Sequence, residues 1–289
     1  MGAALAAGTH SWLVFEQADG SGRGMSEAGA EVAGETGQAR GARLEIRTLK
    51  RDDLIECLLQ GWRDFAAAPL YGLFFGGIYA LGGMTLVALF LALHLPWIGY
   101  PLTMGFALVV PFVAAGTYEV SRALERGEPL GWGRVLGAVW SRSGKDLGWM
   151  ALVTVFALII WVDFAIFIFL MFYGLHIPTV QELVIAVLST GKGVLFAAVG
   201  NTLGAIIAMF VFSITAVSFP LLVDRDVDFV TAMLTSVRCV LKNPAQMVAW
   251  ALLIALFLGA SILSGFVGLF ITLPVLGHAS WHLYRKLVV

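Results

Sequence analysis

Asp163 is the acidic residue whose place in the sequence points most directly to chemistry. It stands in the segment IIWVDFAIF, past the middle of a long apolar run. A carboxylate inside a bilayer is energetically costly, so a functional role is the first hypothesis for such a residue. Asp163 could bind a cation or relay a proton. The plainer alternatives are a protonated or hydrogen-bonded acid near the outer interface, or a span whose register differs from the one given below.

Other polar residues lie in or near apolar runs, and most have a modest explanation. Glu119 stands three residues before Arg122, a spacing at which two side chains pair on one helix. Asn201 opens an apolar run and could donate a hydrogen bond to a neighbouring helix. His278 and His282 are four residues apart, on one helix face, as two metal or haem ligands or two pH-sensing groups could be. No Glu or Cys nearby completes a metal ligand set, so the sequence predicts no metal and no cofactor.

The sequence also lacks the common catalytic motifs. It contains no phosphate loop, no nucleophile-elbow serine and no CxxC pair. The stretch GGIYALGG lies inside an apolar run rather than after a strand, so it is not a dinucleotide fingerprint. We therefore expect no enzyme.

The composition indicates that these residues lie in membrane-spanning helices. Hydrophobic residues make up 59% of the 289 residues and charged residues 13%, about half the share in soluble proteins. A helix needs about 20 mostly apolar residues to cross a bilayer. The sequence predicts an all-α, polytopic membrane protein of about six transmembrane helices, at residues 70–93, 99–120, 147–172, 200–222, 246–264 and 266–284. The last two are separate only if the turn at Ser264–Gly265 is very tight, and a single broken span is the alternative.

The distribution of basic residues predicts the orientation of these spans. Nearly all Lys and Arg residues lie before the first run, in the second-to-third and fourth-to-fifth connections, and in the tail. The other three connections hold only Lys192. The positive-inside rule then places both termini in the cytoplasm. The predicted interfacial anchors are Arg63, Arg122, Arg238 and Arg285. They would attract anionic lipid headgroups, so their positive charge does not call for a nucleic-acid partner.

Two parts of the chain share one plan. Shifting the sequence by 175 residues overlays Arg63 on Arg238 and Pro69 on Pro244, after matching apolar stripes. We expect each stripe to form an amphipathic interfacial helix before a transmembrane hairpin. The predicted repeat units are 50–126, a weaker middle unit 131–225, and 226–289, with helix kinks expected at Pro111 and Pro274.

Small residues predict where helices approach each other. Gly72 and Gly76 form one GxxxG pair, and Gly200 and Gly204 form another. Such pairs let helix backbones come close. We expect them to serve packing within the bundle, with homodimerisation as the alternative.

The first 48 residues differ from the predicted membrane domain, 49–289. They are rich in Gly, Ala and Glu, so we expect a disordered cytoplasmic arm. Met25 opens the stretch MSEAGAE, which resembles an ordinary start, so residues 1–24 could lie before the true start. Cys57 and Cys239 are too few for a disulfide framework, and we expect both to be reduced.

Three segments carry a resemblance to a known family. They are GWRDF followed by a proline, VVPFVAAGTYEVSRALERGE, and FPLLVDRDVDFVTAMLTSVRCVLKNP. Through these segments the chain resembles a bacterial family of six-span proteins known as domain of unknown function 2189. The resemblance covers nearly all of the sequence after the N-terminal arm. The resemblance implies the bacterial inner (cytoplasmic) membrane. Some members are labelled as cytochrome oxidase components, which implies a respiratory association at most. The resemblance supplies no catalytic residues.

These observations leave three functional hypotheses. The first is a non-enzymatic accessory or assembly component of a membrane complex, because no polar chemistry converges in the sequence. The second is a small-molecule or ion transporter with Asp163 as its coupling site, because internal repeats and kinked spans are typical of transporters. The third, a membrane enzyme acting on lipid or quinone, lacks an acid–base or nucleophile pair. The expected partners are the bilayer and another membrane protein or a second copy of the chain.

Overall fold

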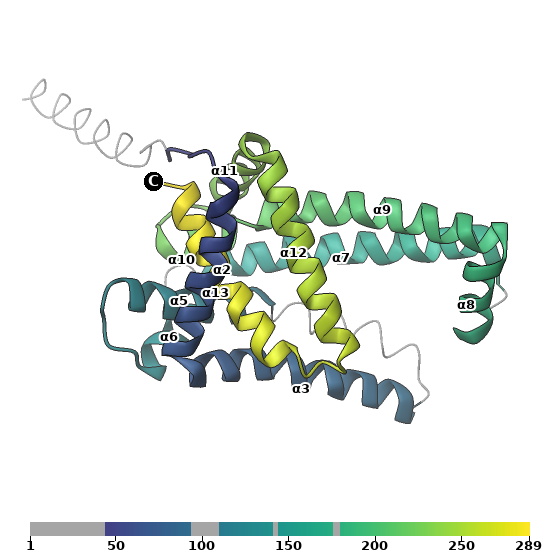
Figure 1. Cartoon of the computed structure of the whole chain (residues 1–289), viewed down its shortest axis with the longest axis horizontal. Helices are drawn as coiled ribbons and strands as arrows, with labels where there is room; N and C mark the ends of the chain where they lie inside the picture. The colour runs from purple at the N-terminus through teal and green to yellow at the C-terminus, as the bar shows by residue number, and fades with distance from the viewer. Residues whose placement is uncertain (1–43, 94–109, 141–143, 176–179) are drawn as a thin grey trace, which may run out of the picture. The chain divides into compact units, whose positions relative to one another are not determined.

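The computed structural model describes residues 44–93, 110–140, 144–175 and 180–289, and the regular structure of these residues is helical (Figure 1). One isolated antiparallel bridge joins Ile46 to Val288. The helices are α2 (Arg51–Ala67), α3 (Pro69–Leu93), α5 (Val110–Glu125), α6 (Trp132–Trp140), α7 (Gly144–Tyr173), α8 (Val180–Ser189), α9 (Gly191–Thr215), α10 (Ser218–Asp224), α11 (Phe229–Lys242), α12 (Pro244–Leu263) and α13 (Leu269–Leu287).

Four helical segments among the described residues are long and apolar enough to cross a membrane. They are Pro69–Leu89, Lys145–Tyr173, Gly191–Asp224 and Pro244–Leu263, and they overlap the first, third, fourth and fifth predicted runs. Half of the second run, residues 99–109, lies outside the described residues. The sixth run lies in α13, which is not among the four. The count of six spans therefore stays a prediction.

The fourth run begins earlier than the sequence indicated. α9 starts at Gly191 rather than at residue 200, because Thr190 caps it: the Thr190 hydroxyl oxygen accepts a hydrogen bond from the Gly193 N–H at 3.0 Å. Asn201 consequently lies inside the helix and does not open it. The preceding helix, α8, was not predicted at all.

The fifth and sixth runs form two helices rather than one broken span. α12 ends at Leu263 and α13 begins at Leu269. The backbone reverses at Gly265 and Phe266, whose φ angles are 69° and 70°. A contact of 2.7 Å between the Ser261 and Thr272 hydroxyls ties the two helices together beside this turn. α13 then runs on through Pro274, whereas Pro111 is only the second described residue of α5.

The two predicted entry helices end in the same way. Ala68 caps the end of α2, with φ −135° and ψ 55°, and Pro69 opens α3. Asn243 caps the end of α11, with φ −129° and ψ 50°, and Pro244 opens α12. The backbone makes one junction twice, at positions 175 residues apart. The repeat of whole units stays a prediction.

The helices of the predicted units pack in a cyclic order. α6 packs against α5, α11 packs against α9 and α10, and α2 closes the cycle by packing against α13. The first helix of each unit thus lies on the end of the unit before it, and α5, α10 and α13 meet one another. The first helix of the middle unit packs in the same way, and the assignment of this unit as a repeat stays a prediction.

The last residues of the predicted N-terminal arm are ordered. The Arg47 N–H donates to the Leu287 carbonyl at 2.8 Å, and Glu45 exchanges backbone hydrogen bonds with Val289. Asn243 fixes the same segment, because its side-chain oxygen accepts from the Leu49 N–H at 2.7 Å. Residues 45–48 therefore belong with the helical part of the chain, while 1–43 lie outside the described residues.

Candidate functional site

The best-organised polar cluster joins three helices. Asp64 of α2, Ser121 of α5, and His278 and His282 of α13 form a continuous chain of hydrogen bonds. Ser121 Oγ lies 2.7 Å from Asp64 Oδ2 and 2.7 Å from His278 Nδ1. His282 Nε2 lies 2.8 Å from the same Asp64 oxygen. His278 and Ser121 are fully buried, whereas the Asp64 and His282 side chains keep 15% and 16% of their surface exposed.

A glycine brings Asp64 within reach of α13. A Cβ at Gly61 would lie 2.6 Å from the Ala279 nitrogen and 2.7 Å from the Val275 oxygen, so only a glycine permits this approach. Asp64 lies three residues later, on about the same face of α2. Sequence reasoning missed this cluster because Asp64 and His282 are 218 residues apart. The sole local signal was the pair of histidines.

The order of the hydrogen-bonded side chains differs from that of a serine-hydrolase triad. In such a triad the imidazole lies between the serine and the carboxylate and takes the serine proton. Here Ser121 lies between the imidazole of His278 and the carboxylate of Asp64. The serine is therefore a bridge and not an activated nucleophile.

The two histidines have separate hydrogen-bond roles. His278 uses Nδ1 for Ser121, and His282 uses Nε2 for Asp64. The two histidines, considered from the sequence as candidate metal or haem ligands, are thus two links of a polar chain. Within the described residues, no group of three His, Cys, Asp or Glu side chains is placed to hold a metal ion.

A second, charged cluster lies at the ends of α5, α10 and α13. Asp224 accepts a hydrogen bond from the Tyr284 hydroxyl at 2.7 Å, and Arg285 reaches both Asp224 and Glu125. Trp281 Nε1 also donates to Glu125, at 3.1 Å. The predicted anchor Arg285 is therefore held by carboxylates.

The other predicted anchors have different surroundings. Arg122 donates to the Val223 carbonyl at 2.9 Å and pairs with Glu119 at 2.6 Å, as its spacing indicated. Arg63 and Arg238 are exposed on α2 and α11. Arg122 thus joins α5 to α10, whereas Arg63 and Arg238 keep exposed side chains.

Glu119 is buried, with 1% of its surface exposed, and it has two cationic neighbours. Besides Arg122 of its own helix, Arg134 of α6 reaches it at 3.2 Å. Arg134 also contacts Glu128. Because both its neighbours are permanent cations, Glu119 serves as a structural ion pair between α5 and α6.

Asp163 lies on an exposed part of α7, and no hydrogen bond or ion pair joins it to another described residue. The expected hydrogen-bonded acid is therefore not found within this part of the chain. Since α7 and α9 lie side by side, with Trp161 3.4 Å from the Cβ position of Gly204, Asp163 stands near the level of Asn201.

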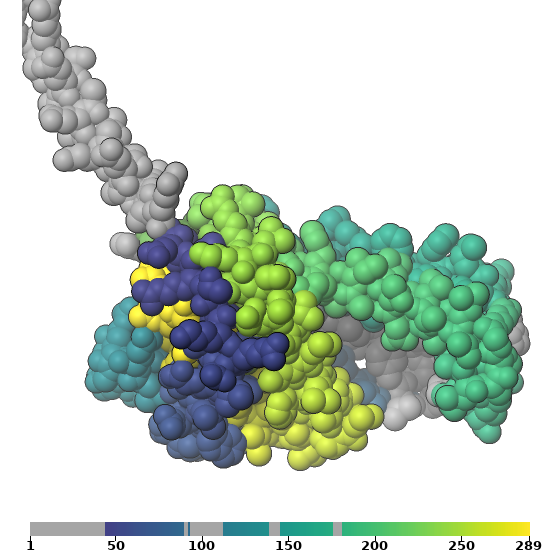
Figure 2. Space-filling model, turned by 45° about the horizontal axis from the view of Figure 1, so that its top comes forward, coloured from purple at the N-terminus to yellow at the C-terminus, as the bar shows by residue number. Residues whose placement is uncertain are grey.

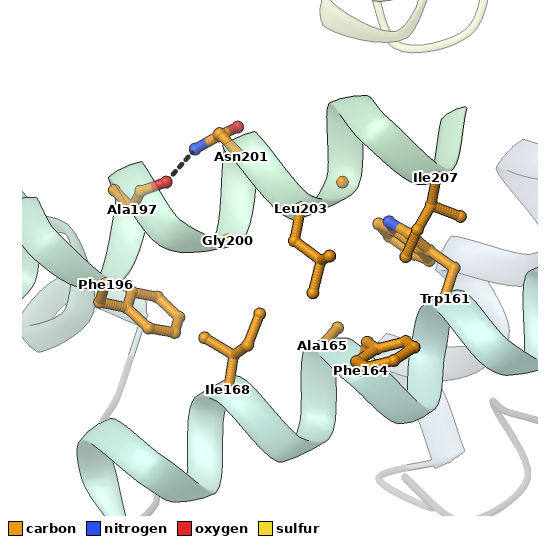
Figure 3. Close-up of a pocket in the computed structure, with 11 residues that line it drawn as sticks. Trp161, Phe164, Ala165, Ile168, Phe196, Ala197, Gly200, Asn201, Leu203 and Ile207 are labelled. Atoms are coloured by element: carbon orange, nitrogen blue, oxygen red, sulfur yellow. Dashed lines mark hydrogen bonds between the residues drawn. The ribbon is translucent and has the colours of Figure 1, made fainter. Parts of the chain in front are cut away.

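A groove of about 290 Å³ runs between α7 and α9 at this level (Figure 3). Trp161, Phe164 and Ile168 of α7 point into it, opposite Leu203. The Asn201 side chain turns instead to its own helix, where its amide donates to the Ala197 carbonyl at 2.8 Å. Among the described residues, Asn201 therefore does not make the predicted bond to another helix.

The two GxxxG pairs have different surroundings. A Cβ at Gly76 would lie 2.7 Å from the Phe270 oxygen, so the first pair serves the packing of α3 against α13. A Cβ at Gly200 would meet no atom within 4 Å. Gly200 therefore opens on the groove and leaves it room for another group, whereas Gly204 packs against Trp161.

The apolar helices and one comparison define the class of protein. The chain is an integral membrane protein. Residues 99–224 are similar to a family described as Predicted integral membrane protein (DUF2189). The matched region includes Glu119, Asp163 and the groove, whereas Asp64, His278 and His282 lie outside it. Comparison with curated proteins found no match, and comparison with solved structures found none.

Proposed function

We propose that this protein is a non-enzymatic accessory or assembly component of a membrane complex, and that a partner helix binds in the groove between α7 and α9. In this proposal the protein lies in the bacterial inner membrane with six spans and both termini in the cytoplasm. A respiratory complex is one candidate for the assembly. The observation that carries the proposal is the open groove at Gly200.

The exposure of α7 supports a partner at this place. Only 11% of its most apolar stretch is buried by the rest of the chain. Lipid alone could cover apolar side chains, but Asp163 is also exposed there. A charged side chain at the centre of a bilayer costs about 2.5–3.5 kcal/mol on insertion scales. A hydrogen-bond donor from a partner helix would offset part of that cost.

The surfaces of α2 and α11 support the proposed orientation. α2 leaves Ile55, Leu59 and Trp62 exposed on the side away from α13, and its outer surface is seen next to α12 in Figure 2. α11 leaves Val230 and Leu234 exposed at matching positions. An apolar stripe beside an exposed arginine is typical of a helix that lies in the membrane interface. Anionic headgroups would bind the arginines on the cytoplasmic side.

Co-purification tests the proposal. The tagged, natively expressed protein is solubilised in mild detergent, and the proteins recovered with it are identified and quantified by mass spectrometry. We expect one membrane protein in stoichiometric amount. The Gly200→Leu variant fills the groove and should lose this partner. A second copy of the chain in the groove would appear as a homo-oligomer and would replace the foreign partner in the proposal.

Ala205→Leu is the matched control for this variant. It also adds apolar bulk to α9, but five residues on, about 140° around the helix from Gly200 and outside the groove. It should keep the partner. Recovery of the protein alone, or equal retention by both variants, would contradict the proposal.

A transporter of small molecules or ions is the second candidate function. The buried chain from Asp64 to His278 favours it, because polar groups that link several helices are typical of proton and ion pathways. In this alternative Asp163 is the intramembrane coupling site. Asp163→Asn should then abolish uptake into proteoliposomes while expression is unchanged. Unaltered uptake by this variant would remove Asp163 from the alternative.

A further inference from the structure

The proton positions in the buried chain can be assigned from its geometry. The Asp64 carboxylate has no proton to donate, so its oxygen accepts hydrogen bonds from the Ser121 hydroxyl and from His282 Nε2–H. The Ser121 hydroxyl has a single proton, which it uses in the hydrogen bond that it donates to Asp64. Its oxygen must therefore accept from His278, which carries its own proton on Nδ1. The neutral His278 ring is left with an unprotonated Nε2.

His278 Nε2 is a buried base. It is inaccessible to solvent and has no hydrogen-bond partner among the described residues. A buried acceptor without a donor costs about 1–3 kcal/mol, so its retention calls for a ligand. An imidazole nitrogen with a free lone pair takes up a proton or accepts a hydrogen bond.

Few charged groups can compete for this nitrogen. The charges that act on His278 are Asp64 of α2 and His282 of its own helix. α3 and α12, which also pack against α13, contain no ionisable acid or base except tyrosines in α3. Of the remaining neighbours, α5 contributes the neutral Ser121, while its Glu119 is paired with Arg122 and its Glu125 with Arg285. α10 contributes Asp224, which is bound to Tyr284.

We propose that His278 Nε2 is a proton-accepting site at the buried end of a relay that runs through Ser121 to Asp64 and the partly exposed surface beside His282. A bound ligand with an acidic O–H or N–H group gives its proton to Nε2 and leaves as the conjugate base, while the Nδ1 proton passes to Ser121 Oγ. The Ser121 hydroxyl proton passes to Asp64 in the same step. His278 ends neutral with its proton on Nε2, and the neutral Asp64 carboxylic acid releases its proton to water. One proton is moved and no electrons are transferred. This activity does not depend on a partner in the α7–α9 groove.

The test is the protonation state of His278 in the full chain. Protein labelled with ¹⁵N-histidine is reconstituted in nanodiscs at neutral pH, and the His278 signals are assigned by their loss in His278→Gln. The relay requires a proton on Nδ1 and none on Nε2. A proton on Nε2 in the unaltered protein would overturn the proposal, and this measurement needs no variant that might misfold.

Variants then test the path itself. Ser121→Ala removes one hydrogen bond of about 1 kcal/mol, so the ratio of the two tautomers should shift by about fivefold toward Nε2–H. Exchange of the ring proton with water should slow by a similar or larger factor. Thr117→Ala is the control, because it removes a buried hydroxyl one turn earlier in α5 whose bond goes to Ala114. Ser121→Thr should restore both signals. Equal exchange in Ser121→Ala and Thr117→Ala would also overturn the relay.

Discussion

Replacing Gly61 with alanine should loosen the contact between α2 and α13. The new Cβ would lie 2.6 Å from one backbone atom of α13 and 2.7 Å from another, well inside ordinary contact distance. Backbone atoms in a helix do not move aside as a flexible side chain does. The two helices must therefore separate, and the 2.8 Å contact between Asp64 and His282 must lengthen with them.

Two opposing effects set the size of this change. Alanine is a better helix former than glycine by about 1 kcal/mol. Overpacking a tight contact costs typically about 1–3 kcal/mol, and here the obstructing atoms are backbone, so the upper half of that range applies. We expect Gly61→Ala to lower the free energy of unfolding by about 1–2 kcal/mol.

Gly148→Ala in α7 is the matched control. A Cβ at Gly148 would meet no atom within 4 Å, so this variant keeps the helix-propensity gain without the clash. The assay is unfolding of the full chain by increasing SDS in mixed micelles, followed by circular dichroism. Gly61→Ala should unfold at a lower SDS fraction than the unaltered protein, and Gly148→Ala at the same or a higher one. If Gly61→Ala matched Gly148→Ala, the close approach of α2 to α13 would be refuted.

Three further predictions concern the parts outside the apolar spans. Asn243→Ala should release the N-terminal segment at 45–49, because it removes a buried hydrogen-bond acceptor worth about 1–3 kcal/mol, and limited proteolysis there should become faster. The hydrogen bond from Lys286 holds the pKa of Asp53 below its ordinary value of 3.8. The resulting stabilisation is present above that value and is lost as the pH falls through the lower, folded pKa. Lys286→Met should therefore reduce this acid-dependent step in thermal melting curves, while the backbone hydrogen bond from Lys50 keeps part of it. Burial raises the pKa of the Cys57 and Cys239 thiols to about 12, so both should alkylate far more slowly at pH 8 in the folded protein than in SDS, and equal rates would contradict their burial.

The long apolar helices were predictable because lipid imposes a strong constraint on composition. α3, α7 and α12 lie where the apolar runs indicated, and the proline junctions at Pro69 and Pro244 open helices as expected. The pair of Glu119 and Arg122 was also predictable, because its two members lie one helical turn apart. Such features depend on residues that are near each other in the sequence.

The start of α9 and the chain of hydrogen bonds from Asp64 to His278 were not predictable, for two different reasons. A polar Thr190 cap and Lys192 hid nine helical residues before the predicted start, although a lysine at a helix end can extend to the interface. Asp64, Ser121 and His278 lie on three helices that meet only in the folded chain. Gly61 gave no sign in the sequence that it faces a backbone.

Photo-crosslinking in intact membranes tests the proposed docking groove most directly. A photoreactive amino acid replaces Leu203, which lines the groove, or Ala205, which lies outside it on the same helix. We predict that position 203 forms a covalent adduct with one membrane protein, whereas position 205 forms adducts with lipid. Lipid adducts alone at both positions would contradict an accessory role through this groove.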